Sequence, residues 1–204
     1  MGSEEIKFYV HENLIRSQPC FFEAALSKKW AEGVERAVRL PEDLPEVFKP
    51  YVQWLYSGRI CSVTKDDEQI DYVLLAQMYG LGEKLIDTRF QDRVLDAMIC
   101  AARAKDKDGE RWYPGEDAVS TVYDGTPKGS PARRFLVDTT VLHGNAKWII
   151  KVGPEDHNKE FLYDLAAALL VPDSSKRNLE ALEVGVPCAY HKHAVDEPCG
   201  SEVK

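Results

Sequence analysis

Residues 6–60 read IKFYVHENLIRSQPCFFEAALSKKWAEGVERAVRLPEDLPEVFKPYVQWLYSGRI, and this stretch carries the strongest structural signals of the chain. Ile6, Phe8 and Val10 alternate with more polar residues, which is the spacing of a half-buried β-strand. A second short strand is predicted over residues 38–40, directly before a proline. The sequence therefore predicts a small sheet at the start of the fold.

Two helices are predicted between and after these strands. The first begins with Ser17 as its N-cap. The second is predicted over residues 45–57, where an apolar stripe begins at Val47 and a glycine follows the last turn. Pro50 inside this helix is expected to kink it, because proline removes one backbone hydrogen bond. The order strand, helix, strand, helix predicts an α+β core.

The sequence motifs FYVHENLI, SQPCFFEAAL and QWLYSGRI within this stretch resemble the BTB/POZ family, and they are most similar to the short BTB proteins of filamentous fungi. The resemblance implies the BTB/POZ fold, in which a small sheet packs against a helical cluster. It also implies a protein–protein interaction module without a catalytic centre. Members of that family are known to form dimers and to bind cullin-type ubiquitin ligase scaffolds.

The resemblance further implies that the first strand of the fold is missing, since Met1 stands where that strand should end and residues 2–5 read as the turn after it. A truncated gene, a shortened expression product, a cloning remnant at residues 1–3 and a replacement by another segment remain open. Without its neighbour, the strand over residues 6–10 would have an open edge. We expect such a chain to be less stable than a full BTB domain and to self-associate through that edge.

A helical hairpin is predicted beyond residue 66, with its first helix ended by Gly80 and its second opened by Gly82. The wording AQMYGLGEKL at this junction resembles the end of BTB domains. The charged run KDKDG at residues 105–109 follows as a hinge. The resemblance therefore places an N-terminally truncated BTB/POZ domain at residues 1–105.

The remaining pattern is helical as far as Leu170, with helices predicted over residues 117–123, 131–143 and 159–170. The wording GSPARRFLVDTTVLHG, EFLYDLAAALL and CAYHKH resembles the helical extension of fungal BTB proteins. We expect a helical extension over residues 106–172 and a mostly irregular tail over residues 173–204.

Composition narrows the class of protein. The chain has 204 residues, of which 44% are hydrophobic and 29% charged, as in ordinary globular proteins. No apolar run reaches the length of a membrane span, so no membrane partner is expected. The net charge of −8 argues against a nucleic-acid partner, because phosphate binding needs clustered Lys and Arg.

The cysteines indicate a reducing compartment. There are five of them, widely spaced, and no secretory signal is recognised at the start of the sequence. We therefore expect reduced thiols in an intracellular protein, cytoplasmic or nuclear. Cys20 and Cys100 stand among apolar residues and are predicted to be small core residues.

Catalytic motifs are weak. Gly80-Leu81-Gly82 lacks the third glycine and the preceding strand of a dinucleotide fingerprint. The sequence also contains no G-x-S-x-G, H-E-x-x-H or P-loop pattern. No catalytic residue and no organic cofactor are therefore predicted, and an enzyme is not expected.

One cluster could bind a metal ion. Cys188, His191, His193 and Cys199 fall within twelve residues, and two Cys with two His are a sufficient ligand set for tetrahedral zinc. The spacing is not that of a familiar zinc finger, so an ordinary polar tail remains the competing interpretation.

The main functional hypothesis follows from the resemblance: a BTB-type oligomerisation or adaptor module that binds itself or a cullin-type scaffold. The alternative is a small metal-dependent protein or enzyme with zinc at this cluster.

Overall fold

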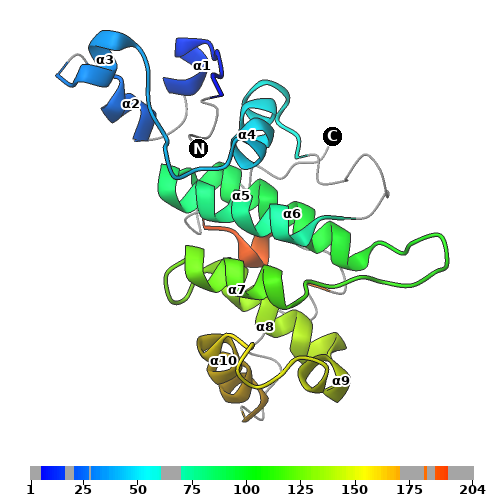
Figure 1. The fold of residues 1–204 in the computed structure, drawn as a ribbon. Helices are drawn as coiled ribbons and strands as arrows, with labels where there is room; N and C mark the ends of the chain where they lie inside the picture. The colour runs from blue at the N-terminus through cyan, green and yellow to red at the C-terminus, as the bar shows by residue number, and fades with distance from the viewer. Residues whose placement is uncertain are drawn as a thin grey trace.

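The structure, a computed structural model, describes residues 6–16, 21–27, 29–60, 70–170, 182 and 187–192, and this part of the chain is built from helices (Figure 1). The helices are α1 (Glu12–Arg16), α2 (Phe21–Ala25), α3 (Ala31–Glu35), α4 (Pro45–Ser57), α5 (Tyr72–Leu85), α6 (Thr88–Arg103), α7 (Glu116–Gly125), α8 (Pro131–His143), α9 (Ala146–Ile150), α10 (Lys159–Leu170) and the short 3-10 turn η2 (Pro187–Tyr190). They form successive layers, with α1 to α4 at one end, the α5–α6 pair and the α7–α8 pair in the middle, and α9 and α10 at the other end.

The predicted α+β fold is wrong. Within the described residues the only β-type residue is Ile70, in a single bridge, and residues 6–10 and 38–40 form no strand. The Phe8 ring instead packs in a T-shaped arrangement with the Phe48 ring of α4, with 5.2 Å between ring centroids. An alternation over five residues is too short to specify a strand when the aromatic side chain finds a helix to pack on. The open strand edge proposed for self-association is therefore not a feature of this fold.

Helix α4 has the bounds predicted from the sequence and is the centre of the N-terminal layer. It continues through Pro50 and ends at Gly58, whose φ of 67° is in the left-handed region that favours glycine. Tyr51 is its most deeply buried side chain, and its hydroxyl donates to Asp87 Oδ2 at 3.1 Å. Phe48 is only half-buried.

Helix α5 does not end at Gly80 as predicted. It continues through Gly80 and Gly82 to Leu85, and Ile86 takes the left-handed cap position with a φ of 56°. The two glycines serve close packing: Gly80 faces Gly125 of α7, and Gly82 faces the start of α6. Helix α6 then begins after Asp87, whose side chain accepts from the Phe90 N–H at 2.9 Å.

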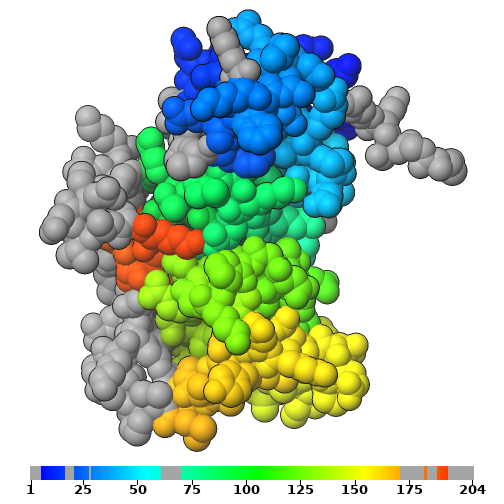
Figure 2. Space-filling view, turned by 90° about the vertical axis from the view of Figure 1, so that its left-hand side faces the viewer, coloured from blue at the N-terminus to red at the C-terminus, as the bar shows by residue number. Residues whose placement is uncertain are grey.

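The last described segment returns to the middle of the molecule. The turn η2 packs against α6 and α8, and Figure 2 shows residues 187–192 seated between the α5–α6 pair and the α7–α8 pair. Tyr190 is fully buried and its hydroxyl donates to Asp138 Oδ2 at 2.9 Å. The Lys192 N–H donates to Asp92 Oδ1 at 3.0 Å. A late segment of the chain is thereby packed against helices from its middle.

Candidate interaction groove

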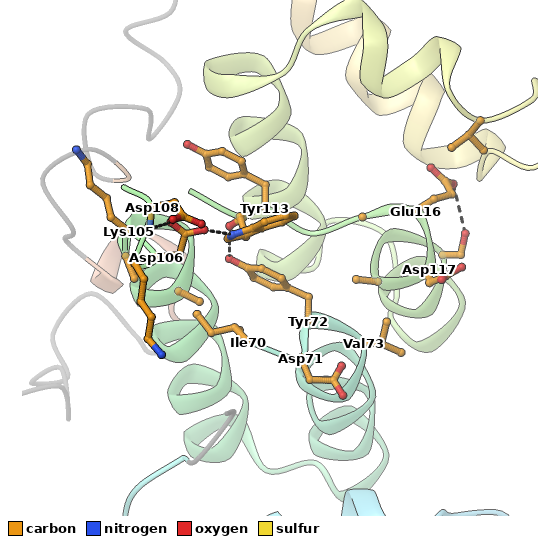
Figure 3. A pocket seen from close by; sticks show the side chains of 18 of the residues that line it. Ile70, Asp71, Tyr72, Val73, Lys105, Asp106, Asp108, Tyr113, Glu116 and Asp117 are labelled. Carbon is orange, nitrogen blue, oxygen red and sulfur yellow. Dashed lines mark hydrogen bonds between the residues drawn. The ribbon is translucent and has the colours of Figure 1, made fainter. Parts of the chain in front are cut away.

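An open groove with a volume of about 1410 Å³ lies where three helices meet (Figure 3). Its walls are the first turn of α5, the last turn of α6, the connection over residues 104–115, and the first turn of α7. Val152 and Asp156, from the connection between α9 and α10, complete the lining. The groove thus draws residues from five segments of the sequence.

Asp106 folds the connection that forms one wall. Its Oδ1 accepts from the backbone N–H groups of Asp108 and Glu110, both at 2.9 Å, and its Oδ2 accepts from Trp112 Nε1 at 2.7 Å. Gly109 has a φ of 85°, which allows the tight turn between these partners. The hydrogen bond from Trp112, followed by those from the backbone, holds the pKa of the Asp106 carboxyl below its usual value. The wall is therefore organised around a carboxylate that is ionised near neutral pH.

Trp112 is exposed but fixed in position. The residue is 57% exposed. Its indole N–H donates to Asp106, and its backbone carbonyl oxygen accepts from the Tyr72 hydroxyl at 2.9 Å. Burial raises the pKa of Tyr72, so its hydroxyl stays protonated and donates. An aromatic side chain that is already held in place loses little conformational freedom when a partner covers it.

The opposite wall is fixed by Glu116 and a buried histidine. His157 Nδ1 lies 2.8 Å from Glu116 Oε2, and His157 Nε2 lies 2.9 Å from the Ile149 carbonyl oxygen. Both partners accept hydrogen bonds, so both ring nitrogens must carry a proton. The hydrogen bond to the Ile149 carbonyl raises the pKa of His157 above its usual value, and the hydrogen bond to Glu116 raises it further by a smaller amount. Glu116 Oε1 also accepts from the Asn158 N–H at 3.0 Å.

Negative charge dominates the lining. The carboxylates that line the groove are Asp71, Asp106, Asp108, Glu116, Asp117 and Asp156, and the cationic side chains are Lys105 and Lys107. Asp71 is occupied as the N-cap of α5, where it accepts from the Leu74 N–H at 2.9 Å. In the part of the chain that the structure describes, Asp108, Asp117 and Asp156 take part in no ion pair.

Of the four residues predicted to bind zinc, the structure describes two, and both lie away from the groove. Cys188 and His191 lie in or beside η2, and neither lines the groove. His191 Nε2 is 2.6 Å from Asp96 Oδ1 on α6. His193 and Cys199 fall outside the described residues, and among the described ones no three His, Cys, Asp or Glu side chains converge on a metal position. Zinc at this cluster stays a prediction, which elemental analysis of protein purified without chelator would test.

The groove itself is not predicted from the sequence. The charged run at residues 105–109 predicts only a hinge, although Asp106 ahead of a glycine and an aromatic pair is a usable signal for an ordered turn. The prediction that Cys100 is buried is wrong, because this residue lies exposed on α6. Cys20 lies outside the described residues.

Comparison of the chain with protein-family models, with curated proteins and with solved structures gave no match. Separately, none of the helices in the described segments is both long enough and apolar enough to cross a membrane.

Proposed function

We propose that this chain is a non-catalytic protein–protein interaction module that binds its partner through the groove walled by Trp112. The observation that carries this proposal is the combination of exposure and fixation at Trp112, which is 57% exposed while Asp106 and Tyr72 hold its indole and its carbonyl. Tryptophan is strongly enriched among the residues that dominate the free energy of protein–protein binding. A rigid aromatic side chain beside an open groove is a suitable anchor for a partner.

The surroundings of Trp112 support the same class of function. The groove is open and large, and Ile70 and Val73 line it beside Tyr72. Such a surface suits an extended segment of another protein better than a small enclosed ligand, which is usually buried over most of its area. The resemblance to BTB proteins implied an interaction module as well. The candidate partners that follow from that resemblance are a second copy of this chain and a cullin-type scaffold. An intracellular location is also part of the proposal.

Affinity capture with matched variants tests the proposal. The tagged protein, its Trp112→Ala variant and its Tyr163→Ala variant are expressed in the cells from which the gene comes, and the captured proteins are quantified. Tyr163 on α10 is 76% exposed and does not line the groove, so its variant controls for the loss of an exposed aromatic ring.

We expect at least one captured protein to fall about tenfold or more with Trp112→Ala, the scale of a hot-spot residue, and to be retained with Tyr163→Ala. Thermal melting of each variant verifies that the fold persists. Identical sets of proteins from all three forms would show that the groove does not recruit a partner.

A further inference from the structure

We infer that the groove binds a cationic segment of its partner, an extended stretch that carries Lys or Arg. This inference rests on the proposed function and adds the chemistry of the partner. It is carried by three features of the groove: unpaired carboxylates on several walls, an apolar floor, and the exposed face of Trp112.

The unpaired carboxylates come from three separate segments. Asp108 belongs to the connection after α6, Asp117 to the first turn of α7, and Asp156 to the connection before α10. Figure 3 shows Asp108 on one side of the groove and Asp117 on the other, with Tyr72 between them. Carboxylates on facing walls of a partly enclosed site reinforce one another and favour a cation inside it.

The two lysines of the lining do not balance this charge. Lys105 and Lys107 face six carboxylates, and both are exposed residues of the same short turn. The protonated His157 offsets only Glu116, to which it is bonded. Asp106 between them is already committed to the turn and to Trp112. The charge that a partner meets across the groove is therefore negative, and a segment rich in Asp or Glu would be repelled.

The apolar floor and Trp112 suit the rest of a Lys or Arg side chain. Long cationic side chains lay their aliphatic stems on apolar surface and keep the charged group in a polar environment. Ile70, Val73 and Ala101 provide such a surface, and Asp108 and Asp117 lie on opposite sides of the same groove. An ammonium or guanidinium group is also attracted to the face of an indole, and the hydrogen bond to Asp106 holds the Trp112 indole in place.

Three labelled peptides of equal length provide the probes. They share one Gly/Ser frame and carry Lys and Arg, Gln, or Glu at the same positions. Binding to the full-length chain is followed by fluorescence anisotropy at low and at physiological salt. We expect the Lys/Arg peptide to bind about tenfold or more tightly than the Gln peptide and to weaken as salt rises, and the Glu peptide not to bind.

Two variants with the same change in net charge separate a groove site from general attraction to an acidic protein. The groove variant is Asp108→Asn, Asp117→Asn and Asp156→Asn. The control variant is Glu23→Gln, Glu46→Gln and Asp124→Asn, which changes exposed carboxylates outside the groove.

Since an exposed ion pair contributes a few-fold in affinity, the groove variant should bind the Lys/Arg peptide about tenfold more weakly. The control variant should stay within about twofold of the wild type, and the salt titration of the wild type gives a readout that needs no variant.

Three results would overturn the inference: no binding of the Lys/Arg peptide to the wild type, equal binding of the three peptides, or equal weakening in the groove and control variants. Each of these leaves the Trp112-dependent capture of a partner untouched, so the proposed function would stand with a different partner chemistry. If Trp112→Ala captured the same proteins as the wild type while the Lys/Arg peptide still bound in a charge-dependent way, the proposed function would be wrong. The groove would then bind cations without recruiting a partner through Trp112.

Discussion

At the scale of single residues, Arg133 is a buried cation whose guanidinium nitrogens all donate hydrogen bonds. Its Nε donates to Thr126 Oγ1 at 3.1 Å, and its Nη2 donates to the carbonyl oxygens of Tyr123, at 2.6 Å, and Thr126. Its Nη1 donates to Glu160 Oε2 at 2.5 Å. The guanidinium carbon also lies 4.4 Å from the centroid of the Tyr123 ring. One side chain on α8 thereby joins the end of α7 to the start of α10.

We expect Arg133→Ala to lower the free energy of unfolding by about 2–4 kcal/mol, because it leaves several buried acceptors without their donor. Arg134→Ala is the matched control, since Arg134 is the next residue, is exposed, and should change stability by less than about 0.5 kcal/mol. Urea unfolding followed by circular dichroism measures both. Similar midpoints for the two variants would mean that the buried network contributes little.

His157 makes stability depend on pH. Its pKa is raised by the Ile149 carbonyl and by Glu116, so the folded chain binds the proton more tightly than the unfolded chain. The stabilisation is therefore complete below the pKa of about 6.5 that histidine has when unfolded, and it is lost as pH rises through the raised pKa. Asp156 acts in the same direction as Glu116.

We expect the melting temperature of the wild type to fall from mildly acidic towards alkaline pH by more than that of His157→Gln. The glutamine variant cannot take up a proton, so the difference between the two curves isolates this histidine. Scanning calorimetry over that range gives both curves. Parallel curves would contradict the assignment of a protonated His157 between Glu116 and the Ile149 carbonyl.

The error at Cys100 also belongs to the residue scale. Its neighbours Ile99 and Ala101 are buried, and the apolar wording around it suggested the same for the cysteine. Successive residues of a helix point about 100° apart, so a residue between two buried ones can still face solvent. Local composition predicts an apolar helix well but does not assign each position to a face.

At the scale of elements, Gly80 and Gly82 on α5 make contrasting demands. A Cβ at Gly80 would meet the Gly125 carbonyl oxygen at 3.8 Å, which is an ordinary contact. A Cβ at Gly82 would lie 2.6 Å from Gln91 Cγ and 3.2 Å from the Phe90 ring. Both Gln91 and Phe90 are fully buried, so neither can move aside easily.

We expect Gly80→Ala to raise the free energy of unfolding by up to about 1 kcal/mol, the gain in helix propensity. Gly82→Ala should lower it by roughly 1 kcal/mol, because overpacking outweighs that gain. Each variant controls for the other, since both make the same chemical change in one helix. Denaturant unfolding decides, and equal stabilisation by both would show that α5 and α6 are not closely packed at Gly82.

Helix boundaries could be predicted from the sequence where local signals mark them, but contacts between helices could not. Helices α4 and α10 have the predicted bounds, because proline, glycine and a long apolar stripe mark them locally. The Gly80 stop was wrong because a glycine that packs against another helix looks, in sequence, like a glycine that ends one. The groove combines residues 70–73, 101, 104–108, 112–113, 115–118 and 120 with Val152 and Asp156, and that juxtaposition exists only after the helices have packed.

At the scale of the whole molecule, the return of residues 187–192 closes the core. Tyr190 is fully buried against Phe135 of α8, with 6.2 Å between ring centroids, and its hydroxyl donates to Asp138. His191 bonds to Asp96, and the Lys192 ammonium bonds to Glu83 of α5. This short segment therefore contacts α5, α6 and α8, which come from the middle of the chain.

We expect Tyr190→Ala to lower the free energy of unfolding by about 3–5 kcal/mol, the usual loss when a fully buried large side chain is truncated. Tyr190→Phe keeps the ring and removes only the bond to Asp138, so it should lose about 1 kcal/mol. Tyr163→Ala, on an exposed residue of α10, should change stability by less than about 0.5 kcal/mol. Urea unfolding of the three variants measures this series. If Tyr190→Ala lost no more than Tyr163→Ala, the segment would not be docked in solution, and the middle helices would carry the core without it.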